Sequence, residues 1–194
     1  MSSAAVALNR GELWLVRHGE TTWSRDGRHT SVTELPLTDR GVEAAREAGT
    51  RLAGHEFSLV LTSPRRRARE TAELAGFPDA VVDEDLAEWA YGQYEGVTTA
   101  EIRESVPDWS VWTHPSPGGE NAEHVTFRVD RAIARVRAVD GDALVFGHSH
   151  ALRALAARWV GLTVAEGRLF RLDPATISVL GYERETPLVV RWNA

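Results

Sequence analysis

Residues 12–20, ELWLVRHGE, join an apolar run of strand length to a cluster of polar side chains. The run from Glu12 to Arg17 is rich in Val and Leu and short enough to be a buried strand. A histidine, a glycine and a glutamate follow it directly. Because ligands of open α/β sheets bind outside the carboxyl ends of the strands, this stretch predicts a buried strand that ends at a binding site.

Further apolar runs of strand length occur along the chain, with helical patterns between them. The runs are Ser58–Thr62, Asp142–Phe146, Ile177–Tyr182 and Leu188–Trp192, and Val81 with Val82 forms a shorter one. Alternating strands and helices are typical of an α/β fold, so we expect a three-layer sandwich with a mostly parallel central sheet and helices on both faces. The last two runs, separated by Glu183–Pro187, predict a hairpin at one edge and hence a mixed sheet.

Helix starts can be predicted from capping residues. We expect helix N-caps at Thr38, Ser63, Thr98 and Asn121. Pro64 would be the first position of the helix that follows Ser63 and ends near Gly76, and Thr98 with Glu101 would form a capping box. A further helix is predicted over His150–Val160. Two long irregular stretches, Ser24–Pro36 and Trp109–Glu120, are expected to shape a binding site. With 194 residues, the chain is expected to form a single domain over residues 1–194.

Composition excludes several classes of chemistry. The chain has no cysteine, and all 22 of its basic residues are arginine, so thiolate catalysis, thiolate-bound zinc, a P-loop lysine and a Schiff base are excluded. The net charge is −6 and the basic residues are scattered, which argues against nucleic acid or a membrane surface as a partner. A small substrate fits this composition better.

The N-terminal segment Met1–Arg10 lacks the basic start and long apolar run of a signal peptide. No apolar stretch approaches the roughly 20 residues that a membrane-spanning helix needs. We therefore expect a cytoplasmic protein.

Polar residues follow three of the predicted strands. They are Arg17, His18, Gly19 and Glu20; Ser63 and Pro64 with Arg65, Arg66 and Arg67; and Gly147, His148, Ser149 and His150. Arginine offers a fixed fork of donors that suits a dianionic phosphoryl group. A neutral imidazole held in line with phosphorus can attack it, while arginines and a second, protonated histidine stabilise the equatorial oxygens. Such a site requires no metal or cofactor.

The leaving oxygen needs a proton, and Glu88 is the best candidate donor. Its neighbours Leu86, Trp89 and Tyr91 are apolar or aromatic. We expect these neighbours to favour the protonated carboxyl, which would protonate the leaving group and then, as a carboxylate, activate water.

Five motifs in order along the chain resemble those of the histidine phosphatase superfamily, also called the phosphoglycerate mutase-like family. They are residues 17–21 (RHGET), residues 62–72 (TSP…RA…TA), Glu88 with Tyr91 and Gly92, residues 117–120 (PGGE) and residues 147–149 (GHS). The match spans nearly the whole chain. The stretches from Arg28 to Thr38 and from Glu88 to Gly96 look like the branch that contains small bacterial acid phosphatases and sugar bisphosphatases.

The resemblance implies roles for individual residues. His18 would be the phosphorylated nucleophile; Arg17, Arg67 and His148 would be phosphate ligands; Glu88 would be the acid; and Ser24, Thr30, Tyr91 and Ser149 would contact substrate. A structural hydrogen bond explains Thr30 and Tyr91 almost as well. Members with mutase activity carry an arginine where this chain has Trp89 and a lysine near the position of Thr99, so hydrolysis of a small phosphorylated substrate is favoured over mutation.

Several interpretations stay open at this stage. The protein could be a phosphoglycerate mutase, or a domain without activity that binds a phosphorylated or protein partner. His148 and His150 could suggest a metal pair, but no third ligand has convincing spacing, and no metal is expected. Trp109 and Trp112 either line a pocket or pack in the core, and the role of His150 is open. His55, His114 and His124 are expected at the surface, and a homodimer is compatible with the sequence.

Overall fold

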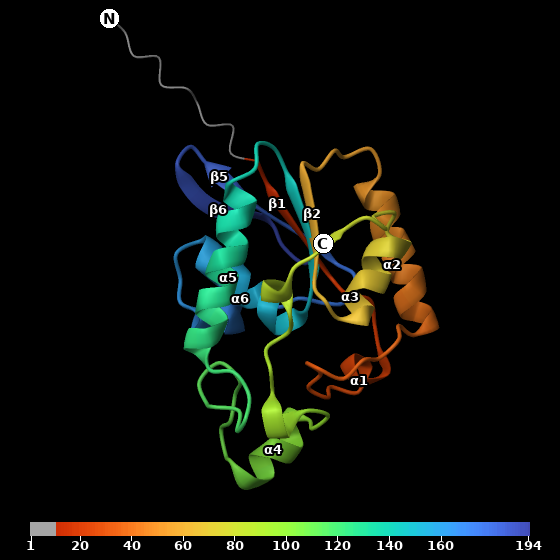
Figure 1. Cartoon of the computed structure of the whole chain (residues 1–194). Coiled ribbons are helices and arrows are strands. Elements are labelled where there is room, and N and C mark those ends of the chain that lie inside the picture. Colours follow the sequence, from red (N-terminus) through yellow and green to blue (C-terminus); the bar gives the residue numbers. More distant parts are fainter. Residues whose placement is uncertain (1–10) are drawn as a thin grey trace, which may run out of the picture.

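A computed structural model describes residues 11–194, in which six strands form one mixed sheet (Figure 1). The strands are β1 (Leu13–Arg17), β2 (Leu59–Thr62), β3 (Val81–Val82), β4 (Ala143–Gly147), β5 (Ile177–Glu183) and β6 (Thr186–Arg191), in the order β3-β2-β4-β1-β5-β6. Strand β1 pairs in parallel with β4 and antiparallel with β5, and β2 pairs in parallel with β3 and β4. The prediction of a mostly parallel sheet with an antiparallel hairpin at one edge is confirmed.

Helices cover both faces of this sheet. They are α1 (Thr22–Arg25), α2 (Asp39–Leu52), α3 (Arg66–Leu74), α4 (Thr99–Ser105), α5 (Ala122–Arg137) and α6 (Ser149–Trp159), with the 3₁₀ turns η1 (Glu84–Leu86), η2 (Gly92–Tyr94) and η3 (Val164–Leu169). In Figure 1, α2 and α3 lie on one side of the sheet and α5 and α6 on the other, while α1 and α4 lie beyond one end of the strands. The predicted three-layer α/β sandwich is confirmed.

The alternation of side chains along the central strands builds a core on each face. Leu13 and Leu15 of β1 belong to the core beneath α5 and α6, whereas Val16 belongs to the core beneath α2 and α3. Strand β4 is buried along its whole length. Because both faces are covered, the central strands are almost entirely apolar until the point where they end.

Local capping signals placed most helix starts correctly. The Thr38 hydroxyl accepts from the Gly41 N–H, and the capping box of Thr98 and Glu101 is present. The Asn121 side chain caps α5 as predicted. The prediction for Ser63 is wrong: α3 begins at Arg66, its N-cap Arg65 makes no side-chain cap, and the Ser63 hydroxyl binds a histidine instead. The Ser63 hydroxyl therefore binds a residue that is distant in sequence and does not cap α3.

A close backbone contact fixes the turn after β1. A Cβ atom at Gly19 would lie 2.5 Å from the carbonyl oxygen of Gly41, so only glycine lets the start of α2 pack on this turn. The Gly19 N–H donates to the Thr71 hydroxyl of α3. The segment that follows the first strand is thereby held against two helices.

No helix among residues 11–194 is long and apolar enough to cross a membrane. The expectation that Met1–Arg10 is not a signal peptide lies outside the described residues.

Candidate active site

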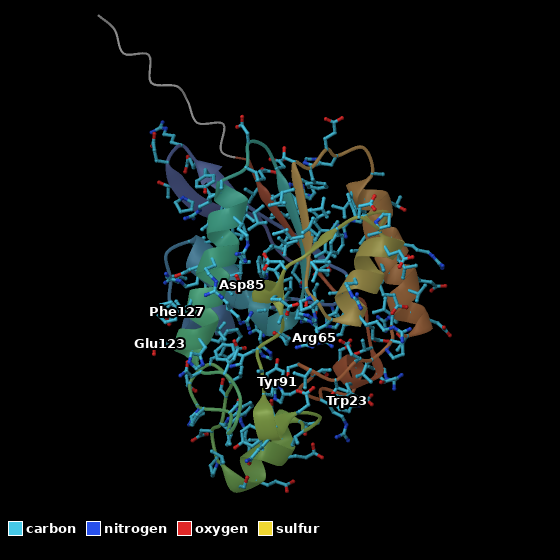
Figure 2. All side chains as sticks on the ribbon, in the orientation of Figure 1. Trp23, Arg65, Asp85, Tyr91, Glu123 and Phe127 are labelled. Atoms are coloured by element: carbon cyan, nitrogen blue, oxygen red, sulfur yellow. The ribbon has the colours of Figure 1, made fainter. Side chains whose placement is uncertain are left out.

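A cavity of about 240 Å³ opens at the carboxyl ends of β1 and β4, on the side of the sheet that faces α4. Its lining residues are Arg17, His18, Ser24, Gly27, Arg28, His29, Thr30, Glu88, Tyr91, Thr99, Ser149 and His150. In Figure 2, Tyr91, which lines this cavity, lies between the sheet and α4. The site thus forms where the sequence predicted it, at the ends of the parallel strands.

His18 is buried at the base of the cavity, and one of its ring nitrogens already makes a hydrogen bond. Its Nδ1 lies 2.7 Å from the carbonyl oxygen of Gly19. Because a carbonyl only accepts, Nδ1 carries the proton and Nε2 of the neutral ring keeps its lone pair. Burial, followed by the charges of Arg67 and Arg17, holds the pKa of His18 well below its ordinary value. The imidazole is therefore neutral and suited to nucleophilic attack through Nε2.

His148 lies beside His18 in the opposite tautomeric arrangement. The two rings are 5.1 Å apart, centroid to centroid, and His148 Nε2 lies 2.7 Å from the Ser63 hydroxyl. That hydroxyl accepts from the Arg65 N–H, and His148 Nε2 is the one acceptor for its own proton among the described residues, so we assign that proton to the bond with Nε2. The buried Nδ1 of His148 then carries a proton and has no partner among the described residues.

The charge state of His148 differs from the sequence-based expectation. Burial first, and then the charges of Arg67 and His18, lower its pKa well below its ordinary value. The expected protonated second histidine is thus neutral in the site as it stands. It offers a neutral N–H donor instead of a cation.

Two arginines, the half-buried Arg17 and the buried Arg67, supply the charge at the base of the cavity. The Arg17 guanidinium donates to the Leu172 carbonyl, and that of Arg67 donates to the carbonyls of Thr30, Ser31 and Thr33. Burial lowers the pKa of both guanidinium groups, and Glu88 is the first charge that opposes this effect. The Nε atoms of Arg17 and Arg67 are buried without a partner among residues 11–194.

Arg67 also fixes the loop that follows α1. Its fork holds three main-chain carbonyls of this loop, while the Glu95 carboxylate accepts from the main-chain N–H groups of Ser31 and Thr33 and from the Ser31 hydroxyl. The pKa of Glu95 is lowered, because these hydrogen bonds outweigh the effect of burial. Arg67 therefore binds carbonyl groups of this loop while Glu95 binds its N–H groups, so the two side chains fix the same loop from both kinds of polar group.

Glu88 lies at the N-terminus of α6. Its Oε1 accepts from the main-chain N–H groups of Trp89 and Ala151, at 2.9 and 2.8 Å. Its Oε2 accepts from the His150 N–H at 3.1 Å. Apolar side chains were expected to dominate around this carboxyl, but its nearest neighbours are hydrogen-bond donors at a helix N-terminus. Oε2 accepts one hydrogen bond and Oε1 accepts two, so Oε2 is the oxygen with more capacity to bind a further group.

The predicted substrate contacts line the cavity, but two of their hydroxyls have local partners. Ser24 and Thr21 form a capping box at the start of α1. The Thr30 hydroxyl donates to the Arg28 carbonyl. Ser149 is the first residue of α6, and the Tyr91 hydroxyl lies 2.6 Å from His150 Nδ1. Seven of the nine predicted site residues line the cavity; Arg67 and His148 lie behind its surface.

A family model described as histidine phosphatase superfamily, branch 1, matches residues 13–194. The chain belongs to the histidine phosphatase superfamily. It is an enzyme of that family, a phosphatase.

Individual relatives agree with the family model. The chain is 48% identical over 182 residues to an acid phosphatase of Mycobacterium tuberculosis, covering 92% of this chain and 90% of the relative. It is 37% identical over 183 residues to sedoheptulose 1,7-bisphosphatase of Saccharomyces cerevisiae, covering 77% and 68% of the two chains. A solved structure of an open reading frame product from M. tuberculosis has a TM-score of 0.91 at 45% identity, covering 94% of this chain and 97% of that one.

Sequence reasoning missed part of the cavity wall of this histidine phosphatase. Gly27, Arg28, His29 and Thr99 line it, and so does His150, whose role the sequence had left open. His29 falls in the long stretch Ser24–Pro36, which was expected to shape a site, so its position along the chain was the available signal. Thr99 was noted only because members with mutase activity carry a lysine near its position. Nothing in the neighbouring sequence indicated that it lines the cavity.

The tryptophans pack and do not line the cavity of this histidine phosphatase. Trp109 and Trp112 are buried in the core, and Trp109 donates to the Pro115 carbonyl. Trp89 donates to the Glu120 carbonyl and contacts Trp112 edge to face. Within residues 11–194, no group of three or more His, Asp or Glu side chains is arranged to hold a metal ion.

Proposed function

We propose that this protein hydrolyses small phosphomonoesters through a phosphohistidine on His18, with Glu88 as the general acid and base. Of the four buried side-chain nitrogens without a hydrogen-bond partner within residues 11–194, three carry the proposal: the Nε atoms of Arg17 and Arg67 and Nδ1 of His148, beside a neutral nucleophile. Buried donors are nearly always paired, so unpaired ones in one place call for an acceptor. A phosphoryl group supplies three acceptor oxygens.

The first step would transfer the phosphoryl group. Nε2 of His18 forms a bond to phosphorus as the bond from phosphorus to the ester oxygen breaks, and the leaving oxygen takes a proton from Glu88. The three donors stabilise charge on the equatorial oxygens without rearranging, because the core already fixes them.

The second step would release phosphate. Glu88, now a carboxylate, accepts a proton from water as the water oxygen attacks the phosphohistidine. The bond between phosphorus and Nε2 breaks, and His18 returns to its neutral form. Phosphate leaves and Glu88 is protonated again.

The names of the relatives support a phosphatase that acts on small metabolites. One is an acid phosphatase and another a sugar bisphosphatase. Mutase activity is disfavoured, because neither Trp89 nor Thr99 supplies the cation that a second acidic group would need. A non-catalytic domain would be expected to lose the nucleophile or the acid, whereas this chain keeps both candidates, His18 and Glu88, in the lining of one cavity.

The test measures phosphate release from a panel of phosphorylated sugars, glycerates and nucleotides, with His18→Ala beside the native enzyme. We expect hydrolysis by the native enzyme and an acid-labile phosphoenzyme in rapidly quenched samples, both absent in His18→Ala. The matched control His124→Ala removes an exposed imidazole of α5. Unchanged turnover in His18→Ala would contradict the mechanism, and no hydrolysis of any ester by the native enzyme would contradict the activity.

Three further sequence-based predictions stand as proposals. A single domain over residues 1–194 agrees with one sheet flanked by two cores, and limited proteolysis would test it. A cytoplasmic location would be tested by cell fractionation. A homodimer would be tested by light scattering.

A further inference from the structure

The motif at residues 117–120 (PGGE) has no part in the proposed phosphoryl transfer, yet it packs against the segment that carries Glu88. The Glu120 N–H donates to the Ala90 carbonyl at 2.9 Å. A Cβ atom at Gly119 would clash with the same carbonyl oxygen, so glycine is what lets the two chains approach. The motif therefore lies directly against the residues that follow the candidate acid.

The carboxylate of Glu120 forms a buried ion pair with Arg128 of α5. Arg128 Nε lies 2.8 Å from Glu120 Oε1 and Nη2 lies 3.0 Å from Oε2, so the pair is bidentate. Arg128 is only 7% exposed. Removing two charged groups from water costs free energy, which their attraction offsets only when further hydrogen bonds satisfy them. The other hydrogen bonds of the two side chains therefore show which part of the molecule the pair holds.

Within residues 11–194, those other hydrogen bonds go to the main chain on both sides of Glu88. Arg128 Nη1 donates to the Ala87 carbonyl at 2.7 Å and to a carbonyl of η1 at 2.9 Å. Glu120 Oε2 accepts from the Ala90 N–H at 2.9 Å. The cation thus holds the residue before Glu88, and the anion holds the chain two residues after it.

The residue next to Glu88 is fixed by the same motif. The buried Trp89 indole N–H donates to the main-chain carbonyl of Glu120 at 3.0 Å. The Glu88 carboxylate itself is held by main-chain N–H groups at the start of α6. Both the main chain and the carboxylate of the candidate acid are therefore fixed, and a displacement of about 1 Å at a reacting group can cost about 10²-fold in rate.

We propose that Glu120 and Arg128 are positioning residues for the general acid: their ion pair fixes the main chain around Glu88 and so places its carboxyl group to protonate the leaving oxygen. This inference rests on the proposed function, in which Glu88 supplies that proton. Neither side chain of the pair lines the cavity, so both act through Glu88 and not on the substrate.

The test uses the dependence of the rate on the leaving group. Propanol leaves as a strong base and needs a proton, whereas p-nitrophenol leaves without one. Since kcat/KM reports the steps up to loss of the alcohol, the ratio of kcat/KM for propyl phosphate to that for p-nitrophenyl phosphate measures proton donation in the first step. Each ratio is measured within one protein, so the fraction of folded enzyme cancels.

Two variants alter the pair and a third provides the matched control. Arg128→Lys keeps a cation beside Glu120 but removes the fork, so the ratio should fall by about tenfold or more. Glu120→Gln removes the anion and keeps an oxygen for the Ala90 N–H, and it should lower the ratio as well. In Arg131→Lys, at an exposed arginine of the same helix that pairs with Asp85, the ratio should stay as in the native enzyme.

Trp89→Phe leaves the ion pair in place and should lower the ratio by a smaller factor, which keeps the test decisive where the charge variants do not fold. An unchanged ratio in every variant that folds, or an equal loss for both esters, would overturn the inference alone and leave the pair with a role in stability. An unchanged ratio in Glu88→Gln would instead overturn the role of Glu88 in the proposed function.

Discussion

The two ends of the cavity differ in charge and in origin. The inner end, made of Arg17, His18, Arg67 and His148, carries two guanidinium groups beside two neutral imidazoles, and all of its members except Arg17 are buried. The outer wall, formed by the side chains of His29, Thr99, Tyr91 and His150, is uncharged and consists of rings and hydroxyls. Strand ends and the first turn of α3 supply the inner end, while loops and helix starts supply the outer wall. The two ends therefore differ in whether their own side chains present charge to a bound group.

The two histidines of the inner end show how one residue type obtains two roles. His18 donates through Nδ1 to a carbonyl, which leaves a lone pair on Nε2. His148 faces the Ser63 hydroxyl through Nε2, which leaves a proton on Nδ1. In the proposed mechanism, the partner atom of each ring, and not its charge, decides which histidine acts as nucleophile and which as donor.

The largest expected effect on the reaction rate comes from Glu88, which lies between the inner end and the outer wall. Glu88→Gln should slow single-turnover release of an alkyl alcohol by about 10²–10⁴-fold, since positioned proton transfer contributes that much. Release of p-nitrophenol should fall far less, because this leaving group needs no proton. Stopped-flow measurement of both reactions tests the assignment. Equal losses for the two esters would remove Glu88 as the acid.

Arg67→Lys should lower kcat/KM by about 10²-fold, because one ammonium cannot replace a fork that serves both phosphate and loop. Since Arg67 also holds the carbonyls of Thr30 and Thr33, the variant should lower the Tm as well. Steady-state kinetics with p-nitrophenyl phosphate and a thermal melt check both effects. Arg69→Lys, at an exposed arginine of the same helix, is the matched control. A normal kcat/KM in the Arg67 variant would contradict its role as a phosphate ligand.

Ser63→Ala should lower kcat by about tenfold, the effect of losing one hydrogen bond that fixes a catalytic ring. Ser63→Thr, which keeps the hydroxyl, should restore most of it. The ¹⁵N chemical shifts of His148 report its tautomer directly. A wild-type tautomer in Ser63→Ala would show that Ser63 does not set the proton position.

The smallest effect concerns stability of the outer wall toward acid. The pKa of His29 is lowered from its ordinary value to about 4, so in this range the unfolded chain binds a proton that the folded chain does not. The contribution is complete above pH 6.5 and is lost as pH falls toward 4. His29→Gln should therefore lose less Tm than the native protein over that range, by about a few degrees. Parallel thermal melts at both pH values test this, and identical slopes would contradict it.

Much of the fold followed from local patterns. Short apolar runs predicted the strands, and Thr38, Thr98 and Asn121 marked helix starts, because strand periodicity and capping act over a few residues. The motif around His18 and the one around His148 predicted the inner end for the same reason. Both lie where buried parallel strands stop, so adjacent strands bring them together.

Other features required the folded chain. Ser63 resembles a helix cap but binds His148, and Arg67 turns out to hold a loop that lies more than thirty residues earlier in the sequence. Trp109 and Trp112 could have lined the cavity and instead pack in the core. In each case the side chain contacts residues that are distant in sequence, and these contacts form only when the folded chain buries it.

By itself, the sequence determined the sheet, the family motifs and the charged inner end, since each depends on residues close together along the chain. Only the tertiary structure decided the outer wall. His29 falls in a long irregular stretch and His150 follows a strand, but nothing along the chain predicts that His29 contacts Thr99 and Tyr91 or that Tyr91 binds His150. Their proton positions follow from those contacts, which no spacing along the chain specifies.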